Sequence, residues 1–235
     1  VKLIIEDYVD VFTTTQSVSG AWGGVSGVQE HLKRNFGVLT AYDVDPVNYT
    51  DFLTAVNENI DYVIGYFLQP NGGLTWHGST DESFFECHQQ WFMIAVRMLY
   101  NRNTAYDFRT EGALAWNFLT NTNYSGHDMY VHNYVNHNAF FSYRDVTSAG
   151  DFQVYNDWKG SYEVGAALWG MALNYDLVSS HISSYDNVTY NYLDEMVKHV
   201  KRPSSQNGFF SASGNWIRIL NWTDAGYLPD PAIWT

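Results

Sequence analysis

The chain has 235 residues, and its 12 basic and 25 acidic side chains give a formal net charge of −13. Aromatic residues make up 17% of the sequence and charged residues only 16%, which excludes an intrinsically disordered chain. The negative charge argues against a nucleic-acid partner, and the lack of a long uncharged apolar stretch argues against a membrane span. We expect one acidic globular domain over residues 1–235, either complete or a fragment of a longer chain.

Helical periodicity dominates the sequence. Residues 1–12 fit a strand or a first helix equally well. Apolar residues at helical spacing predict amphipathic helices, whereas segments that are apolar on every side predict buried helices. The first pattern occurs at 25–39, 52–67, 104–120 and 188–200, and the second at 83–100 and 161–177.

The order of these elements predicts an all-α fold. A buried helix passes to an amphipathic one through a short link, and an amphipathic helix passes to the next buried one through a long loop, at 69–81, 121–160 and 203–215. Helical hairpins with an inner buried layer and an outer amphipathic layer describe an α/α toroid, complete or incomplete. The long loops of a toroid gather at one end, where we expect a site. The alternative is an irregular helical bundle.

Three carboxylates are the candidates for acid–base chemistry. Asp81 precedes a buried helix and Glu86 lies within it, on a stripe that should face the interior of the ring. Glu163 opens the second buried helix. A carboxylate in such a place can have a raised pKa and act as a general acid. The structural alternatives are helix capping for Asp81 and interaction with the helix dipole for Glu163.

The loops supply candidate binding residues. Trp76, His77 and Trp158 lie in or beside them, and an exposed tryptophan can stack on a sugar, whereas a buried one anchors its loop. The loop at 121–160 is rich in His and Asn, and its residues either bind a substrate or bond to their own backbone. Its histidines lack the spacing of a zinc site, and no EF-hand spacing appears. We therefore expect no metal and no cofactor.

The layout resembles the α/α-toroid carbohydrate-active enzymes, which include unsaturated-glycuronyl-type glycoside hydrolases and toroid polysaccharide lyases. The segment 161–173 resembles an inner helix of those hydrolases, and 76–93 resembles their Trp-x-Asp-Asp stretch with Asp81 as the matching carboxylate. The pairs Asn136-His137 and Tyr143-Arg144 resemble the Asn, His, Tyr and Arg of the lyases. That resemblance implies that His137 or Tyr143 removes a proton while Asn136 and Arg144 neutralise a uronate.

Three functional hypotheses follow. The first is a secreted glycosidase whose paired carboxylates come from Asp81, Glu86 and Glu163. The second is a polysaccharide lyase, against which the net charge counts because a polyanionic substrate would be repelled. The third is a non-catalytic cell-surface or filament-forming protein, for which a homo-oligomer is expected. An extracellular or cell-surface location is favoured by the composition, and four Asn-X-Ser/Thr triplets mark potential glycosylation sites.

Overall fold

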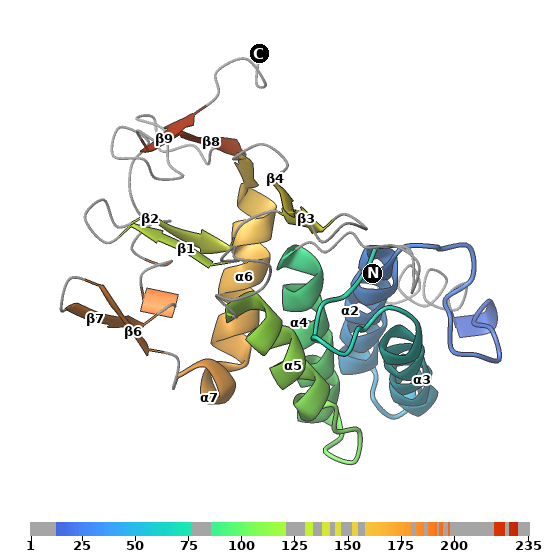
Figure 1. Cartoon of the computed structure of the whole chain (residues 1–235). Helices are drawn as coiled ribbons and strands as arrows, with labels where there is room; N and C mark the ends of the chain where they lie inside the picture. The colour runs from blue at the N-terminus through green and yellow to red at the C-terminus, as the bar shows by residue number, and fades with distance from the viewer. Residues whose placement is uncertain are drawn as a thin grey trace.

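Helices form the packed part of the molecule. The computed structural model describes the backbone at 13–76, 86–120, 130–133, 138–141, 144–146, 152–154, 158–179, 182–185, 188–191, 193–194, 197, 219–223 and 226–229. Side chains are described at 13–76, 88–120, 165–179, 191, 193, 194 and 197. The helices are α2 (Val28–Val44), α3 (Thr50–Tyr66), α4 (Glu86–Arg102), α5 (Arg109–Thr120), α6 (Ser161–Leu173) and α7 (Tyr175–Val178) (Figure 1). The predicted all-helical class is confirmed for this packed part.

Local sequence explains how α2 and α3 form. The carboxylate of Glu30 accepts a hydrogen bond from the backbone N–H of Gly27 at 3.2 Å, which caps the start of α2. The predicted apolar stripe of α3 is buried at every position, and Phe67, directly after the helix, continues it. Burial of this stripe against α2 is the main stabilisation of the first hairpin.

Helix α4 lies at the centre of the helical part and packs against α2, α3, α5 and α6 (Figure 1). Its residues from Trp91 to Val96 are buried on every side, as the sequence predicted. The same prediction is wrong for α6, where 45% of the Trp169 surface is exposed. An apolar sequence alone does not say which face of a helix meets its neighbours.

A tight turn between α3 and α4 docks on α5. Gly72 has a φ of +90°, and a Cβ atom there would lie 2.1 Å from the carbonyl oxygen of Leu114. Hydrogen bonds from Gly72 N to Gln69 O and from Gly73 N to Asn71 Oδ1 close the turn. Only glycine combines this backbone conformation with so close an approach.

Short strands occupy segments for which the sequence predicted loops or a helix. Strands β1 and β2 form one antiparallel pair, β3 and β4 another, β6 and β7 a third, and β5, β8 and β9 a three-stranded sheet in that order. Their bounds are β1 (Tyr130–Asn133), β2 (Asn138–Phe141), β3 (Arg144–Val146), β4 (Phe152–Val154), β5 (Trp158–Gly160), β6 (Ile182–Tyr185), β7 (Val188–Asn191), β8 (Ile219–Thr223) and β9 (Gly226–Pro229).

Two predictions are therefore corrected. The segment 121–160, expected to be a loop, contains five of the strands. The helix expected over 188–200 is wrong at its start, because Val188–Asn191 pairs with Ile182–Tyr185 as a β-hairpin. Strands of this hairpin are rich in β-branched and aromatic residues, which favour a pleated backbone over a helical one.

Candidate functional site

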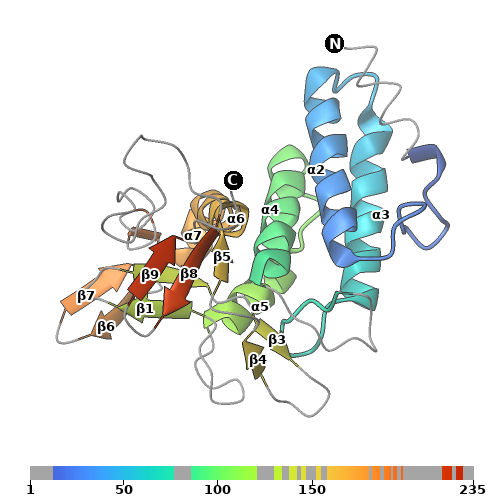
Figure 2. The ribbon, with the colours of Figure 1, turned by 90° about the horizontal axis from the view of Figure 1, so that it is seen from above.

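Helices α2, α4 and α6 begin toward the same end of the molecule in Figure 1. Figure 2 shows α2 and α4 lengthwise and α6 nearly end-on, so α6 crosses α4 at an angle. Between α2 and α4, the ammonium of Lys33 lies 4.6 Å from the Trp91 ring, and Arg102 pairs with Asp43 further along both helices. The contacts thus advance in the same direction along α2 and α4. We call the region where α2, α4 and α6 begin the N-terminal end of the bundle.

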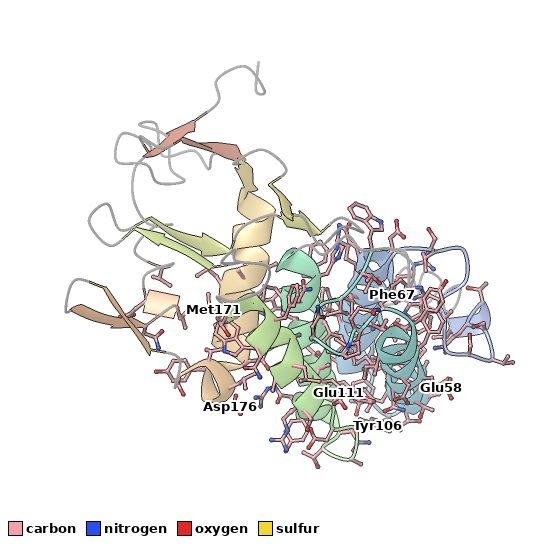
Figure 3. All side chains as sticks on the ribbon, viewed as in Figure 1. Glu58, Phe67, Tyr106, Glu111, Met171 and Asp176 are labelled. Carbon is pink, nitrogen blue, oxygen red and sulfur yellow. The ribbon has the colours of Figure 1, made fainter. Side chains whose placement is uncertain are left out.

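The register of α4 against α6 is set by a series of polar contacts. The amide of Gln90 lies against Gly170. One turn further, the Asn174 amide donates to the backbone carbonyl of Met93 at 3.2 Å. The guanidinium of Arg97 then donates to Asn174 Oδ1 at 3.2 Å and pairs with Asp176. Figure 3 shows Asp176 at the end of the bundle opposite to that of Phe67.

The same register orders two of the predicted catalytic positions along their helices. Glu86 lies one turn before Gln90 on α4, and Glu163 lies two turns before Gly170 on α6. At 1.5 Å for each residue, these intervals are about 6 Å and about 10.5 Å along the two helix axes. Only the backbones of Glu86 and Glu163 are described.

The helix dipoles act on both positions. Glu86 is the first residue of α4, and Glu163 is the third residue of α6. The positive ends of the two helix dipoles favour an ionised carboxylate at each.

Trp76 links the loop before α4 to the first two parallel helices. Its carbonyl accepts a hydrogen bond from the backbone N–H of Val28 at 3.0 Å. Its ring meets the imidazole of His88 edge-on, with centroids 5.6 Å apart. It is partly buried and packs against the core, which agrees with the anchoring role.

The second turn of α4 carries three consecutive buried polar side chains, His88, Gln89 and Gln90. None of the three is among the catalytic and binding residues predicted from the sequence. His88 lies between the rings of Trp76 and Trp91, and Gln90 lies on the opposite side, against Gly170. Three adjacent polar residues inside an otherwise apolar helix are a signal that the sequence contained, because at least one of them must point into the protein whichever face is buried.

The other predicted site residues are placed only in part. Arg144 lies in β3 and Trp158 in β5, the strand that leads directly into α6, and only their backbones are described. The remaining predicted residues, Asp81, His77, Asn136, His137 and Tyr143, lie outside the described residues. The lyase hypothesis depends mainly on this last group.

A second buried polar cluster anchors the N-terminal segment to the first hairpin. His31 Nδ1 faces the backbone N–H of Trp22 at 3.4 Å and the Asn59 amide nitrogen at 3.0 Å. The Asn59 amide also donates to the carbonyl of Gly20 at 2.9 Å. Burial, with a smaller contribution from the Arg34 guanidinium, lowers the pKa of His31 from 6.5 to about 4 against the opposing effect of Glu30. This cluster joins chain segments and is structural in character.

Over the part of the chain whose side chains are described, no three His, Cys, Asp or Glu residues gather as metal ligands do. None of the described helices has both the length and the apolar character needed to cross a bilayer. No family model, curated protein or solved structure matches the chain.

Proposed function

We propose that this protein is a glycoside hydrolase in which Glu86 and Glu163 form the catalytic carboxylate pair. The observation that supports this most strongly is the register of α4 and α6, fixed by Gln90 against Gly170 and by Asn174 against Met93. Both glutamates lie near the beginning of one of these two contacting helices, Glu86 at the first residue of α4 and Glu163 at the third residue of α6. Carboxyl groups about 5–9.5 Å apart serve the two known modes of glycoside hydrolysis.

The chemistry requires opposite protonation states. The carboxylic acid gives its proton to the glycosidic oxygen as the bond to the anomeric carbon breaks. The carboxylate either activates a water molecule that attacks that carbon or attacks it directly, and in the second case water later hydrolyses the glycosyl-enzyme. The helix dipoles favour the ionised member, and repulsion between the two groups favours the protonated one.

The helix arrangement supports an α/α toroid as the fold of this enzyme. Helix α2 contacts α4 and α4 contacts α6, and the contacts of each pair advance in the same direction along both helices. Helices α3 and α5 return in the opposite direction, as the pairing of Arg109 with Tyr100 and of Gly112 with Val96 indicates for α5. This is the repeating unit of such a ring.

We further propose a neutral saccharide substrate and an extracellular or cell-surface location. The formal charge of −13 disfavours an acidic polymer by long-range repulsion. The partly exposed Trp76 gives the N-terminal end of the bundle an aromatic surface of the kind that stacks on sugar rings.

The test is hydrolysis of neutral polysaccharides by the wild-type protein and by Glu86→Gln and Glu163→Gln, followed as the release of reducing ends. Each variant should lose at least about 100-fold in kcat, because each removes a proton donor or a carboxylate from the reaction. Glu58→Gln, at an exposed position on α3, is the matched control and should keep full activity. Unchanged activity in both site variants would refute the assignment.

A further inference from the structure

One of the Asn-X-Ser/Thr triplets of the sequence lies in a turn whose side chains are described. It reads Asn48-Tyr49-Thr50 and connects α2 to α3, which begins at Thr50. The triplets that begin at Asn123 and Asn187 lie outside the described residues, and only the backbone of Asn221 is described. The geometry around Asn48 therefore decides whether the folded protein has room for a sugar chain there.

The turn presents the Asn48 side chain to solvent. Asn48 and Thr50 are both exposed. The backbone of the turn is closed from within, because the N–H of Tyr49 donates to the carbonyl of Asp45 at 3.1 Å. A sugar chain attached to Asn48 would displace water and not packed side chains, as N-linked glycans do at protein surfaces.

The hydrogen bonds of Asn48 are compatible with this attachment. Its backbone N–H donates to Asp45 Oδ1 at 3.3 Å, and its Nδ2 donates to Asp45 Oδ2 at 2.9 Å. The nitrogen of a primary amide carries two protons. A glycan replaces one of them, and the other remains for the Asp45 carboxylate. The turn can thus keep the same hydrogen bonds with and without the glycan.

Exposed apolar side chains precede Asn48 in the chain. Val47 is 82% exposed and Val44, at the end of α2, is 48% exposed. Apolar surface of this kind favours association of one molecule with another when it is left open. A bulky hydrophilic sugar chain on the next residue would cover Val47 and oppose that association.

The turn is remote from the proposed catalytic end. It follows the last residue of α2, and the 17 residues of that helix span about 25 Å from its start at the N-terminal end of the bundle. A glycan on Asn48 therefore leaves that end of the molecule open.

We infer that Asn48 is an acceptor for an N-linked glycan, transferred by an oligosaccharyltransferase from a polyprenyl-diphosphate-linked oligosaccharide. A bond forms between Nδ2 and the anomeric carbon as the bond from that carbon to the diphosphate oxygen breaks. The polyprenyl diphosphate leaves with the electron pair, and the amide loses one proton. The Thr50 hydroxyl completes the triplet that the transferase recognises. The inference rests on the proposed extracellular location and is independent of the catalytic carboxylates.

The first measurement is peptide mapping of the protein recovered from the cells that make it. Peptide N-glycosidase in heavy-oxygen water converts a glycosylated asparagine into an isotopically labelled aspartate. The label should appear at position 48, and mass spectrometry of the peptides reads this position separately from the other triplets.

The second measurement uses variants directed through the secretory pathway of a eukaryotic cell by a cleavable signal peptide. Asn48→Gln and Thr50→Ala should each lose one glycan from the mass of the secreted protein. Thr50→Ser is the matched control, and it should keep the glycan because it keeps the hydroxyl. Modification of Asn48 in Thr50→Ala would overturn the inference.

Thermal unfolding tests whether the turn accommodates the sugar chain. The glycosylated wild-type protein should melt at a temperature no lower than that of Asn48→Gln, because the Asp45 contacts are retained and the side chain is exposed. A lower melting temperature of the glycosylated protein would show that the folded turn has no room for the glycan, which contradicts the inference.

The outcomes separate this inference from the proposed function. An unmodified Asn48 in both preparations refutes the acceptor assignment alone. If Asn48 is unmodified in the cells that make the protein but modified after secretion, the extracellular location is wrong and the acceptor assignment stands. Asn48→Gln should hydrolyse neutral polysaccharides as the wild type does, so loss of the hydrolase assignment leaves the glycan assignment intact.

Discussion

Replacing His31 by glutamine should remove a large part of the acid sensitivity of this fold. The imidazole is 1% exposed, and its Nδ1 faces two donors, the backbone N–H of Trp22 and the amide of Asn59. Nδ1 is therefore an acceptor, and the neutral ring carries its proton on Nε2. Protonation at Nδ1 would set a cation against both donors, which agrees with a pKa of about 4 in place of 6.5.

The sign and size of the effect follow from linkage. Because the pKa is lower in the folded state, the unfolded chain binds the proton more readily between pH 6.5 and pH 4. The stabilisation by neutral His31 is complete above pH 6.5 and is lost as the pH falls through this window. At about 1.4 kcal/mol for each tenfold change in the protonation equilibrium, the loss is about 3 kcal/mol in all, and about 2 kcal/mol by pH 5.

Urea unfolding of the wild-type protein and of His31→Gln at several pH values between 7 and 4 tests this reasoning. Glutamine keeps an acceptor but does not titrate, so the difference between the two unfolding curves cancels all other groups. The free energy of unfolding of the wild type should fall more steeply with acid than that of the variant. Parallel pH profiles would show that His31 titrates alike in the folded and unfolded chains, which would refute its burial in the neutral form.

Two further substitutions test the packing. Gly72→Ala should cost about 2 kcal/mol or more in the free energy of unfolding, because φ is +90° and the Leu114 carbonyl oxygen lies where the methyl group would be. The control Gly37→Ala, on an exposed face of α2 with open space around it, should instead stabilise the protein by about 0.5–1 kcal/mol. Equal effects of the two substitutions would contradict the description of the turn at Gly72. Asn174→Ala should cost about 1–3 kcal/mol in the free energy of unfolding, because it removes the hydrogen bond to the Met93 carbonyl and the acceptor of Arg97 Nε. Thermal unfolding beside the partly exposed control Asn57→Ala, which should change stability by less than about 0.5 kcal/mol, measures this effect.

Helix positions were the most predictable part of this protein. The buried stripe of α3 and the fully buried segment of α4 follow from apolar periodicity, which depends on residues only a few positions apart. At the start of β7, apolar periodicity predicted the wrong structure. Val188 fits a helical stripe with later apolar residues, but its pairing with Tyr185 decides the structure, and pairing of strands is not visible in the period of one segment.

The candidate site could be predicted only as a set of residue types. Glu86 and Glu163 were candidates because each lies in an apolar helix, but the pairing that we propose for them depends on the register of α4 against α6. That register is fixed by Gly170, whose missing side chain admits Gln90, and by the bonds of Asn174. Contacts between residues so far apart in the chain leave no periodic pattern in the sequence.

The contacts between α4 and α6 also bear on how the chain folds. The residues that Asn174 and Asp176 join to α4 are 77 to 81 positions away. Closing so long a loop costs conformational entropy before any contact compensates for it. Docking of α6 on α4 is therefore expected to be slower than formation of the α2–α3 and α4–α5 hairpins. During synthesis, α4 emerges well before α6, so the side of α4 that packs against α6 stays uncovered in the interval. That interval is when the nascent chain is most exposed to aggregation and most in need of a chaperone.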